Sequence, residues 1–239
     1  MAITMAQALN QALHDAFEAD DKVVLFGEDV GTLGGVFRIS DKLQERFGDK
    51  RCFDTPLAES GIAGTAVGMA IYGYPAFEQI VSHIAKMRNR SRGTVKMPIT
   101  VRIPFGGGIG AVEHHSESPE AYFAHTAGLK VVSPGTPSDA YSLLTESIFS
   151  DDPVIFFEPK RRYWLKEEAS LPVRTEPIGK CVVRREGTTA TLAAYGPMVK
   201  TCMETAEAAE AEGWDLEVID IRSLTPFDHQ TIVESPVMS

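Results

Sequence analysis

Short apolar runs, with the composition of buried strands, alternate along this chain with segments that have the apolar spacing of helices. Residues 23–26, 129–132 and 154–157 are such runs, and residues 5–17 carry apolar side chains three and four positions apart. Continuous apolar strands are typical of a parallel sheet that is covered on both faces. The repeated strand–helix–strand order therefore predicts an α/β fold with a mostly parallel sheet and helices on both faces.

Local signals mark the ends of several predicted helices. Thr4 and Gln7 have the spacing of a capping box at the start of the first helix. Ser40 is expected to cap a second helix, and Ser138 a later one that reaches residue 149. Pro119 is placed to open a short helix, because proline suits the first helical position.

A polar stretch punctuated by prolines separates two parts of the chain. We expect a first domain over residues 1–163, a linker over residues 164–180 and a second α/β domain over residues 181–239. The second part contains one strand–helix–strand unit, over residues 191–220. A single unit of this kind cannot cover its own sheet, so we expect the second domain to be incomplete.

Composition narrows the class of protein. The net charge of −10 disfavours nucleic acid and anionic membranes as partners. No apolar run approaches the ~20 residues that span a bilayer, and the first residues lack the pattern of a secretory signal. The three cysteines are far apart and are typical of buried thiols in a reducing compartment. These features predict a cytoplasmic protein without a targeting segment.

One carboxylate, Glu59, stands at the expected start of a helix whose following residues, 61–71, carry no ionisable group. A carboxylate there is stabilised by the helix dipole and by free backbone N–H groups. The small residues after it allow another backbone or a flat ligand to come close. The alternative interpretation is an acid that only caps the helix.

Other polar groups follow predicted strands. Glu28 and Asp29 follow the strand at residues 23–26, and His114 and His115 follow a glycine-rich loop. Ligands of open α/β sheets bind at the carboxyl ends of strands, and an imidazole there can move protons. Adjacent histidines also suit a metal, but no metal-ligand spacing accompanies them. The chain has no dinucleotide fingerprint, no Walker lysine and no nucleophile elbow.

Five stretches, in the same order along nearly the whole chain, resemble the β subunit of the E1 component of 2-oxo acid dehydrogenase complexes. The closest resemblance is to the branched-chain, 2-oxoisovalerate type. The stretches are residues 26–31, 34–38, 54–59, 114–120 and 157–161. The resemblance implies a transketolase-like pyrimidine-binding domain over residues 1–163 and a partial transketolase C-terminal domain. Five collinear motifs favour a functional role for Glu59 over a simple cap.

The resemblance also implies an activity and its residues. The family is an oxidoreductase that decarboxylates 2-oxo acids with thiamine diphosphate and passes the acyl group to the lipoyl domain of E2. In this chain Glu59 is expected to contact N1′ of the cofactor's aminopyrimidine and to share a proton with it. Leu57 and Glu28 are expected to line the cofactor site. His115 is expected to donate a proton during acyl transfer to the lipoyl group.

Partners and metals are implied in the same way. The chain has no Gly-Asp-Gly segment, and its only asparagines are Asn10 and Asn89. The resemblance therefore implies that an E1 α subunit binds the diphosphate and its Mg2+, in an α2β2 heterotetramer that works with the E2 core. It also implies a structural monovalent cation, K+. The cation ligands correspond to Ile99, Thr100, Ser147, Ser150 and Asp152.

Two departures from the family leave alternatives open. Relatives have about a dozen more residues between Gly73 and Pro75, the length of a strand with its turns. They also continue past residue 239 and complete the C-terminal domain. A pyruvate- or acetoin-type E1 β subunit of the same fold is one alternative. A non-catalytic assembly subunit with an incomplete cofactor pocket is the other.

Overall fold

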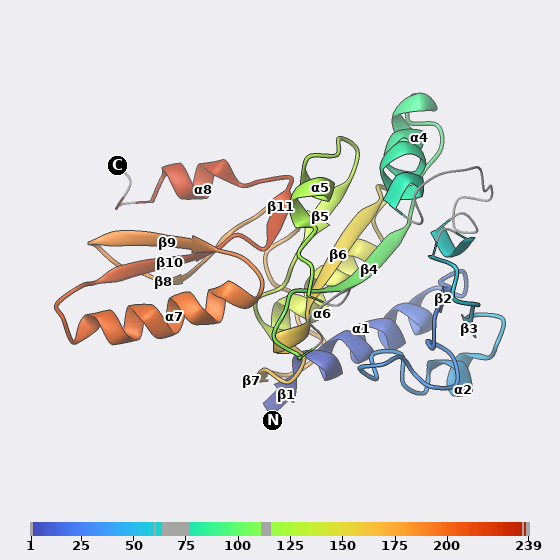
Figure 1. The fold of residues 1–239 in the computed structure, drawn as a ribbon, viewed down its shortest axis with the longest axis horizontal. Coiled ribbons are helices and arrows are strands. Elements are labelled where there is room, and N and C mark those ends of the chain that lie inside the picture. Colours follow the sequence, from blue (N-terminus) through green and yellow to red (C-terminus); the bar gives the residue numbers. More distant parts are fainter. Residues whose placement is uncertain (1, 60, 64–76, 111–115, 236, 238–239) are drawn as a thin grey trace.

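The computed structural model describes residues 2–59, 61–63, 77–110, 116–235 and 237. Figure 1 shows a larger N-terminal part around one sheet and a smaller C-terminal part around another. The larger sheet has four strands in the order β11-β5-β6-β4. Its members are β4 (Thr100–Phe105), β5 (Lys130–Val132), β6 (Val154–Pro159) and β11 (Ser223–Thr225). β4, β5 and β6 are parallel, and β11 is antiparallel to β5.

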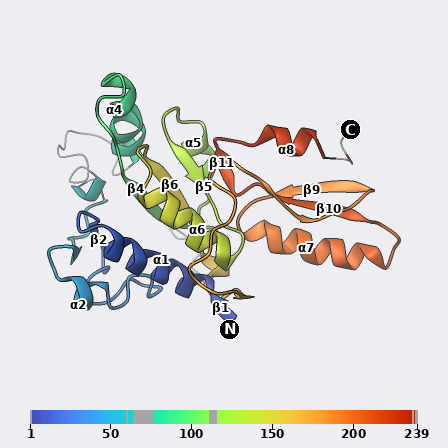
Figure 2. The same cartoon turned by 180° about the vertical axis from the view of Figure 1, so that it is seen from behind.

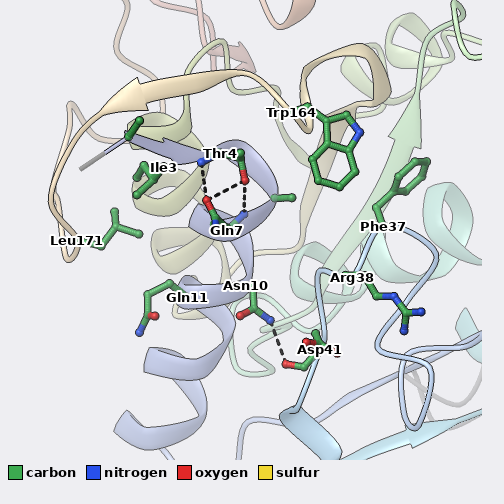
Figure 3. Close-up of a pocket in the computed structure, with 12 residues that line it drawn as sticks. Ile3, Thr4, Gln7, Asn10, Gln11, Phe37, Arg38, Asp41, Trp164 and Leu171 are labelled. Carbon is green, nitrogen blue, oxygen red and sulfur yellow. Dashed lines mark hydrogen bonds between the residues drawn. The ribbon is translucent and has the colours of Figure 1, made fainter.

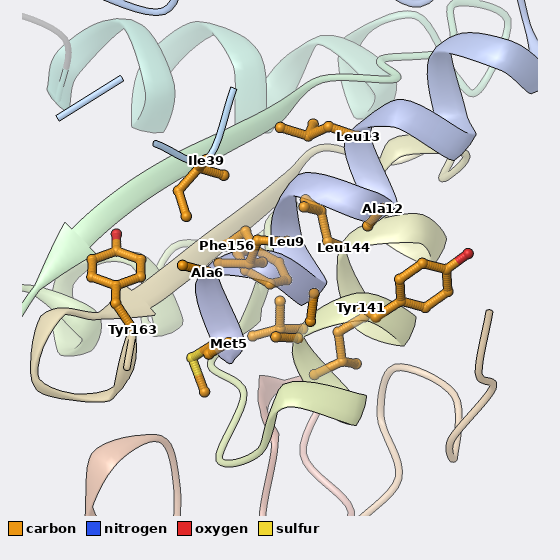
Figure 4. Packing of buried hydrophobic residues seen from close by; sticks show 14 of the residues in the cluster. Met5, Ala6, Leu9, Ala12, Leu13, Ile39, Tyr141, Leu144, Phe156 and Tyr163 are labelled. Carbon is orange, nitrogen blue, oxygen red and sulfur yellow. The ribbon is translucent and has the colours of Figure 1, made fainter. Parts of the chain in front are cut away.

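Helices cover both faces of this sheet, as the sequence predicts. Alternate residues of β6 face opposite sides, so Phe156 packs with α1 (Met5–Ala19) and α6 (Pro137–Ile148), as Figure 4 shows. Ile155 and Phe157 face the other way, toward the π-helical η1 (Gln79–Ile84), α4 (Ala85–Arg90) and α5 (Glu120–Ala124). Every residue of β6 is buried, which confirms the prediction of a two-sided strand.

The start of α1 is as predicted. The Gln7 backbone N–H donates to Thr4 Oγ1 at 3.2 Å, and the Thr4 backbone N–H donates to Gln7 Oε1 at 2.9 Å. The capping box is therefore complete, and it fixes the register in which Leu9 and Leu13 enter the core.

Two predicted caps are wrong. α2 (Leu43–Phe47) begins after Lys42, whose φ of 63° is left-handed, and Ser40 supplies only its carbonyl to the Leu43 N–H, at 3.2 Å. α6 is capped by Thr136 instead of Ser138, since the Asp139 N–H donates to Thr136 Oγ1 at 3.1 Å. Proline favours the first helical position, which places the cap one residue before Pro137.

A separate pair of parallel strands comes before this sheet in the chain. β2 (Leu25–Gly27) pairs with β3 (Cys52–Asp54), and Gly27 lies opposite Asp54. The buried strand predicted at residues 23–26 starts later, and Val24 is 45% exposed. Within the described ranges β2 has one strand neighbour, so the prediction of a strand buried on both faces is wrong. Residues 61–63 are helical, and most of the helix predicted after Glu59 lies outside the described residues.

The chain after residue 163 contains the predicted unit and, besides β11, two further strands that were not predicted. β9 (Ala190–Ala194), α7 (Pro197–Glu210) and β10 (Leu216–Asp220) form the predicted parallel unit. β8 (Val182–Arg185) adds an antiparallel strand to β10. β7 (Lys166–Glu168), which lies inside the predicted linker, pairs with β1 (Ala2–Thr4) at the start of the chain. The short α8 (His229–Val233) follows β11, and Figure 2 shows these elements from behind.

A buried cluster of charges joins the two parts. Arg222 and Asp139 are fully buried, and Arg222 Nε donates to Asp139 Oδ1 at 2.8 Å. Arg184 Nη2 donates to Asp220 Oδ2 at 2.9 Å and also bonds Asp139. Because Asp139 belongs to α6 and the other three residues come from the C-terminal part, the cluster ties that part to the first sheet.

Candidate functional site

Parallel pairing brings the segments that carry Glu28 and Glu59 to one place. β2 and β3 run in the same direction, and their last residues, Gly27 and Asp54, are partners. The Thr55 N–H donates to the Gly27 carbonyl at 2.9 Å and extends the pairing beyond the strands. Both acids therefore follow neighbouring strand ends, at the edge where ligands of α/β sheets bind.

Asp54 holds the loop that follows β2. Asp54 Oδ1 accepts from the Gly31 N–H at 2.6 Å, and Oδ2 accepts from the Thr32 N–H at 3.4 Å. A Cβ on Gly31 would lie 2.8 Å from Asp54 Oδ2, so a side chain at position 31 would displace this contact. The carboxylate of Asp54 thus shapes the loop around Glu28 and is not itself free for a ligand.

Glu28 is the electrostatically unusual acid of this site. Its side chain is partly buried, and Oε1 is buried with no hydrogen-bond partner. Burial raises the pKa of Glu28, and the charges of Glu59 and then Asp29 raise it further. Glu28 therefore holds a proton more readily than an ordinary glutamate does, and it lies close enough to Glu59 to respond to its charge.

Glu59 and Leu57 lie on an open surface of the chain. Glu59 is exposed and Leu57 is 81% exposed. The Ile62 N–H donates to the Ala58 carbonyl at 2.9 Å, which confirms that a helix starts beside Glu59. A large exposed apolar side chain next to a carboxylate is the kind of surface that a ligand or a partner chain covers.

The predicted histidines lie outside the described residues, which resume at Ser116. The glycine loop before them follows β4, and the Gly106 N–H donates to the Glu117 carbonyl at 2.9 Å. Glu117, after the loop, therefore lies next to Gly106 at the carboxyl end of β4. Gly106 and Glu117 are thus held together at this edge of the four-stranded sheet.

A cavity of about 460 Å³ opens beside this loop, between the two parts of the chain. Its wall combines the loop glycines with Lys160 and Arg161 after β6, and with Tyr195 and Met198 from the C-terminal part. Lys160 is buried, and burial lowers its pKa. The Tyr195 hydroxyl donates to Glu120 Oε1 at 3.4 Å. The motif at residues 157–161 therefore contributes basic groups to this wall.

Glu158 of the same motif has a structural role that sequence reasoning missed. It is 1% exposed, and its Oε1 accepts from Arg102 Nε at 2.5 Å. Its Oε2 accepts from the Tyr163 hydroxyl at 2.7 Å, and Phe37 stacks on the Tyr163 ring at 4.3 Å. The buried carboxylate thus fixes the end of β6. The sequence does not reveal this pairing, because Arg102 belongs to the neighbouring strand β4 and Tyr163 follows β6 outside any strand.

A second cavity, of about 690 Å³, lies beside the start of α1, and neither Glu28 nor Glu59 lines it. Figure 3 shows the capping box on one side of it, Trp164 and Phe37 on another, and the contact of Asn10 with Asp41. Asn10 Nδ2 donates to the Asp41 carbonyl at 3.1 Å, so the loop after β2 is tied to α1.

The residues predicted to bind a monovalent cation do come together. Ile99 immediately precedes β4 and Thr100 begins it, Ser147 is near the end of α6, and Ser150 and Asp152 lead into β6. They lie where these strands start, at the edge opposite to their carboxyl ends. Among the described residues no group of three or more histidine, cysteine, aspartate or glutamate side chains could hold a metal. In the same residues no helix is long and apolar enough to cross a membrane.

Comparisons with known proteins agree with the fold. Residues 1–164 match the transketolase pyrimidine-binding domain, and residues 179–237 match the transketolase C-terminal domain. A solved structure titled as a split-gene transketolase, an inactive β4 tetramer, has a TM-score of 0.78 and 24% identity over 99% of this chain and 76% of that chain. The chain is therefore a transketolase-like protein, and its pyrimidine-binding domain implies that it binds thiamine diphosphate.

Curated relatives define the particular family. A 3-methyl-2-oxobutanoate dehydrogenase subunit β of Mycobacterium tuberculosis is 53% identical over 98% of this chain and 71% of its own length. Pyruvate dehydrogenase E1 β subunits of Leifsonia xyli and Acholeplasma laidlawii are 51% and 46% identical over the same share of this chain, and over 73% and 76% of their own lengths. The chain belongs to the E1 β subunits of the 2-oxo acid dehydrogenases, which are lipoamide-linked oxidoreductases.

The length of the alignment with the Mycobacterium relative can be compared with the shorter connection expected in this chain. The match to the Mycobacterium protein spans 248 positions, whereas this chain has 239 residues. That relative therefore has residues without a counterpart here, in keeping with the shorter connection expected between Gly73 and Pro75. The 71% coverage of the relative leaves part of its length unmatched.

Proposed function

We propose that this chain is the β half of an α2β2 dehydrogenase that acts on branched-chain 2-oxo acids and delivers the acyl group to the lipoyl domain of E2. The E1 α subunit follows from membership of the family. The single observation that carries the site is the pair Glu28 and Glu59 at the ends of β2 and β3.

The residues present fit the aminopyrimidine of thiamine diphosphate. A nitrogen heterocycle needs a carboxyl group that can hold or accept a proton, and the raised pKa of Glu28 supports this role for a carboxyl group at the site. The unpartnered Oε1 of Glu28 has capacity for a further hydrogen bond. The exposed Leu57, two residues before Glu59, offers apolar surface to a ligand. When bound, the cofactor supplies the electron sink that decarboxylation of a 2-oxo acid requires.

Each residue then has a distinct role in the proposal. Glu59 receives a proton from, or returns it to, N1′ of the aminopyrimidine. Glu28 is a positioning residue whose own proton affinity is coupled to the charge of Glu59. His115 donates a proton as the acyl group passes to the lipoyl arm, since imidazole suits proton transfer near neutral pH.

Metal binding to the diphosphate is assigned to the partner. The chain lacks the Gly-Asp-Gly segment and the asparagine that hold Mg2+ in enzymes with both halves on one chain. The diphosphate and its Mg2+ therefore belong to the α subunit in this proposal, and activity requires both chains.

The preference for branched-chain substrates is supported by the motifs at residues 114–120 and 157–161 and by the relative of that type at 53% identity. A pyruvate-type enzyme is the second candidate, because a pyruvate relative is 51% identical. A non-catalytic subunit is the third, because the alignment indicates residues that this chain lacks.

Substrate profiling of the assembled complex distinguishes these candidates. The chain is purified with its α subunit, and kcat/KM is measured for 3-methyl-2-oxobutanoate and for pyruvate with an artificial electron acceptor. A higher value for the branched substrate supports the proposal, and a higher value for pyruvate replaces it with the second candidate. No turnover with either substrate, from a complex that has formed, identifies an assembly subunit.

A further inference from the structure

A cation that the chain itself supplies, the Lys130 ammonium, contacts two of the five residues expected to bind a monovalent cation. Lys130 is the first residue of β5, and it shares the strand partner Val154 with Thr100 of β4. Lys130 Nζ donates to Ser150 Oγ at 3.0 Å and lies 3.3 Å from Asp152 Oδ2. The ammonium group is therefore already bound by two of the five expected ligands.

A second cation occupies the other oxygen of Asp152. Arg88 Nη1, from α4, lies 2.8 Å from Asp152 Oδ1. The side chains of Arg88, Lys130 and Asp152 are about one third exposed, at 36%, 32% and 38%. Two positive groups thus face one carboxylate, and an added monovalent cation would meet net repulsion here.

The remaining expected ligands are mostly engaged within the chain. The Ser147 hydroxyl donates to the Leu143 carbonyl at 2.6 Å, and the Ser147 carbonyl accepts from the Ser150 N–H at 3.2 Å. The Ile99 carbonyl accepts from the Val154 N–H at 2.9 Å. The Thr100 hydroxyl is buried without a partner, but one hydroxyl does not make a coordination shell.

The position of Lys130 is favourable for a positive charge on other grounds. α6 ends at Ile148, and Ser150, which accepts from Lys130, lies two residues beyond that end. The C-terminus of a helix carries a partial negative charge, and a cation placed there stabilises the helix.

We infer that the Lys130 ammonium, held by Ser150 and Asp152, takes the structural place of the monovalent cation, so that this chain does not use K+ to join α6 to β6. The residues present do not fit a bound metal while Lys130 is charged. This inference does not depend on the proposed substrate or on the roles of Glu28, Glu59 and His115.

The test is thermal unfolding of the purified full chain in chloride salts of K+ and of tetramethylammonium at equal ionic strength, which equalises screening. We expect the same melting temperature for the wild type in both salts. Lys130→Ala is expected to melt about 2–4 °C lower in tetramethylammonium, the shift for loss of one partly buried ion pair in a protein of this size. K+ is expected to restore most of that loss by entering the vacated position.

Lys96→Ala is the matched control, because Lys96 forms an exposed ion pair with Asp151 at 3.1 Å, next to the same loop. We expect it to melt as the wild type does and to show no K+ response. A specific K+ stabilisation of the wild type would overturn the inference. So would a Lys130→Ala variant that is not rescued by K+, or one that is no less stable than Lys96→Ala.

Discussion

Glu28 and Glu59 follow two parallel strands whose last residues are paired, and burial and then the charge of Glu59 raise the pKa of Glu28. The two residues are 31 positions apart in the chain, and the pairing of β2 with β3 brings the segments that carry them together. An electrostatically coupled pair at the carboxyl edge of a sheet is typical of a functional site.

Replacing Glu59 by Gln is expected to lower kcat of the α2β2 complex by about 10²–10⁴, the contribution typical of a general acid–base group. Glutamine keeps the size of the side chain but cannot exchange a proton. The measurement is turnover of a 2-oxo acid at saturating thiamine diphosphate. Glu45→Gln is the control, since Glu45 is exposed on α2, and it should keep full activity. A loss below tenfold for Glu59→Gln would exclude the proposed proton transfer.

The raised pKa of Glu28 predicts how stability depends on pH. A carboxyl with a higher pKa in the folded state binds more protons than in the unfolded state, so its contribution to stability falls as pH rises through that interval. Glu28→Gln should therefore be more stable than the wild type at neutral pH, and the difference should vanish in acid. The measurement is the melting temperature of the full chain from acid to neutral pH.

A double variant shows whether Glu59 is a source of the Glu28 shift. With Glu59→Gln as the background, the pKa of Glu28 should move toward its ordinary value, since one raising charge is gone. The stabilisation by Glu28→Gln at neutral pH should then be smaller than in the wild-type background. An equal gain in both backgrounds would mean that the two carboxyl groups are not coupled.

His115→Ala is expected to separate two half-reactions. Decarboxylation with an artificial acceptor should survive better than acyl transfer to lipoamide, because the proposed proton donation belongs to the transfer step. The measurement compares both rates in one preparation of the complex. Equal losses in the two assays would contradict the role proposed for His115.

Asp139→Ala is expected to destabilise the protein by about 3–5 kcal/mol, because it leaves the fully buried Arg222 without its carboxylate partner. Urea unfolding of the full chain measures the loss. Asp139→Asn keeps the side-chain volume. If part of the effect is lost packing, this variant should lose less stability than Asp139→Ala. The exposed Asp21 provides the control, and Asp21→Ala should change stability by less than about 0.5 kcal/mol.

Structural features that depend on residues close together in the chain could be predicted from the sequence. The capping box of Thr4 and Gln7, the buried strand β6 and the unit β9-α7-β10 are local patterns, and the structure confirms them. Ser40 failed as a cap because α2 begins only after Lys42, without a side-chain cap, and Ser138 failed because Pro137 takes the first helical position and Thr136 caps the helix. A single preferred residue type thus identifies the presence of a helix more reliably than the residue at which the helix begins.

Pairings between distant residues were not predictable in the same way. β7 joins β1 across more than 160 residues, and β11 returns to β5 of the first part. Neither strand is long or strongly alternating, since each has three residues. At the site, sequence patterns placed Glu28 and Glu59 at strand ends but could not show that Glu28 is the acid with the buried, unpartnered oxygen.

The most direct measurement is a crystal structure of the α2β2 complex with thiamine diphosphate bound. We expect the Glu59 carboxylate within about 2.6–3.2 Å of N1′ of the aminopyrimidine, the range of a proton-transferring hydrogen bond. Glu28 is expected beside it, and the diphosphate on the α subunit. A structure in which Glu59 points away from the bound cofactor, or in which this chain alone holds the diphosphate, would contradict the account.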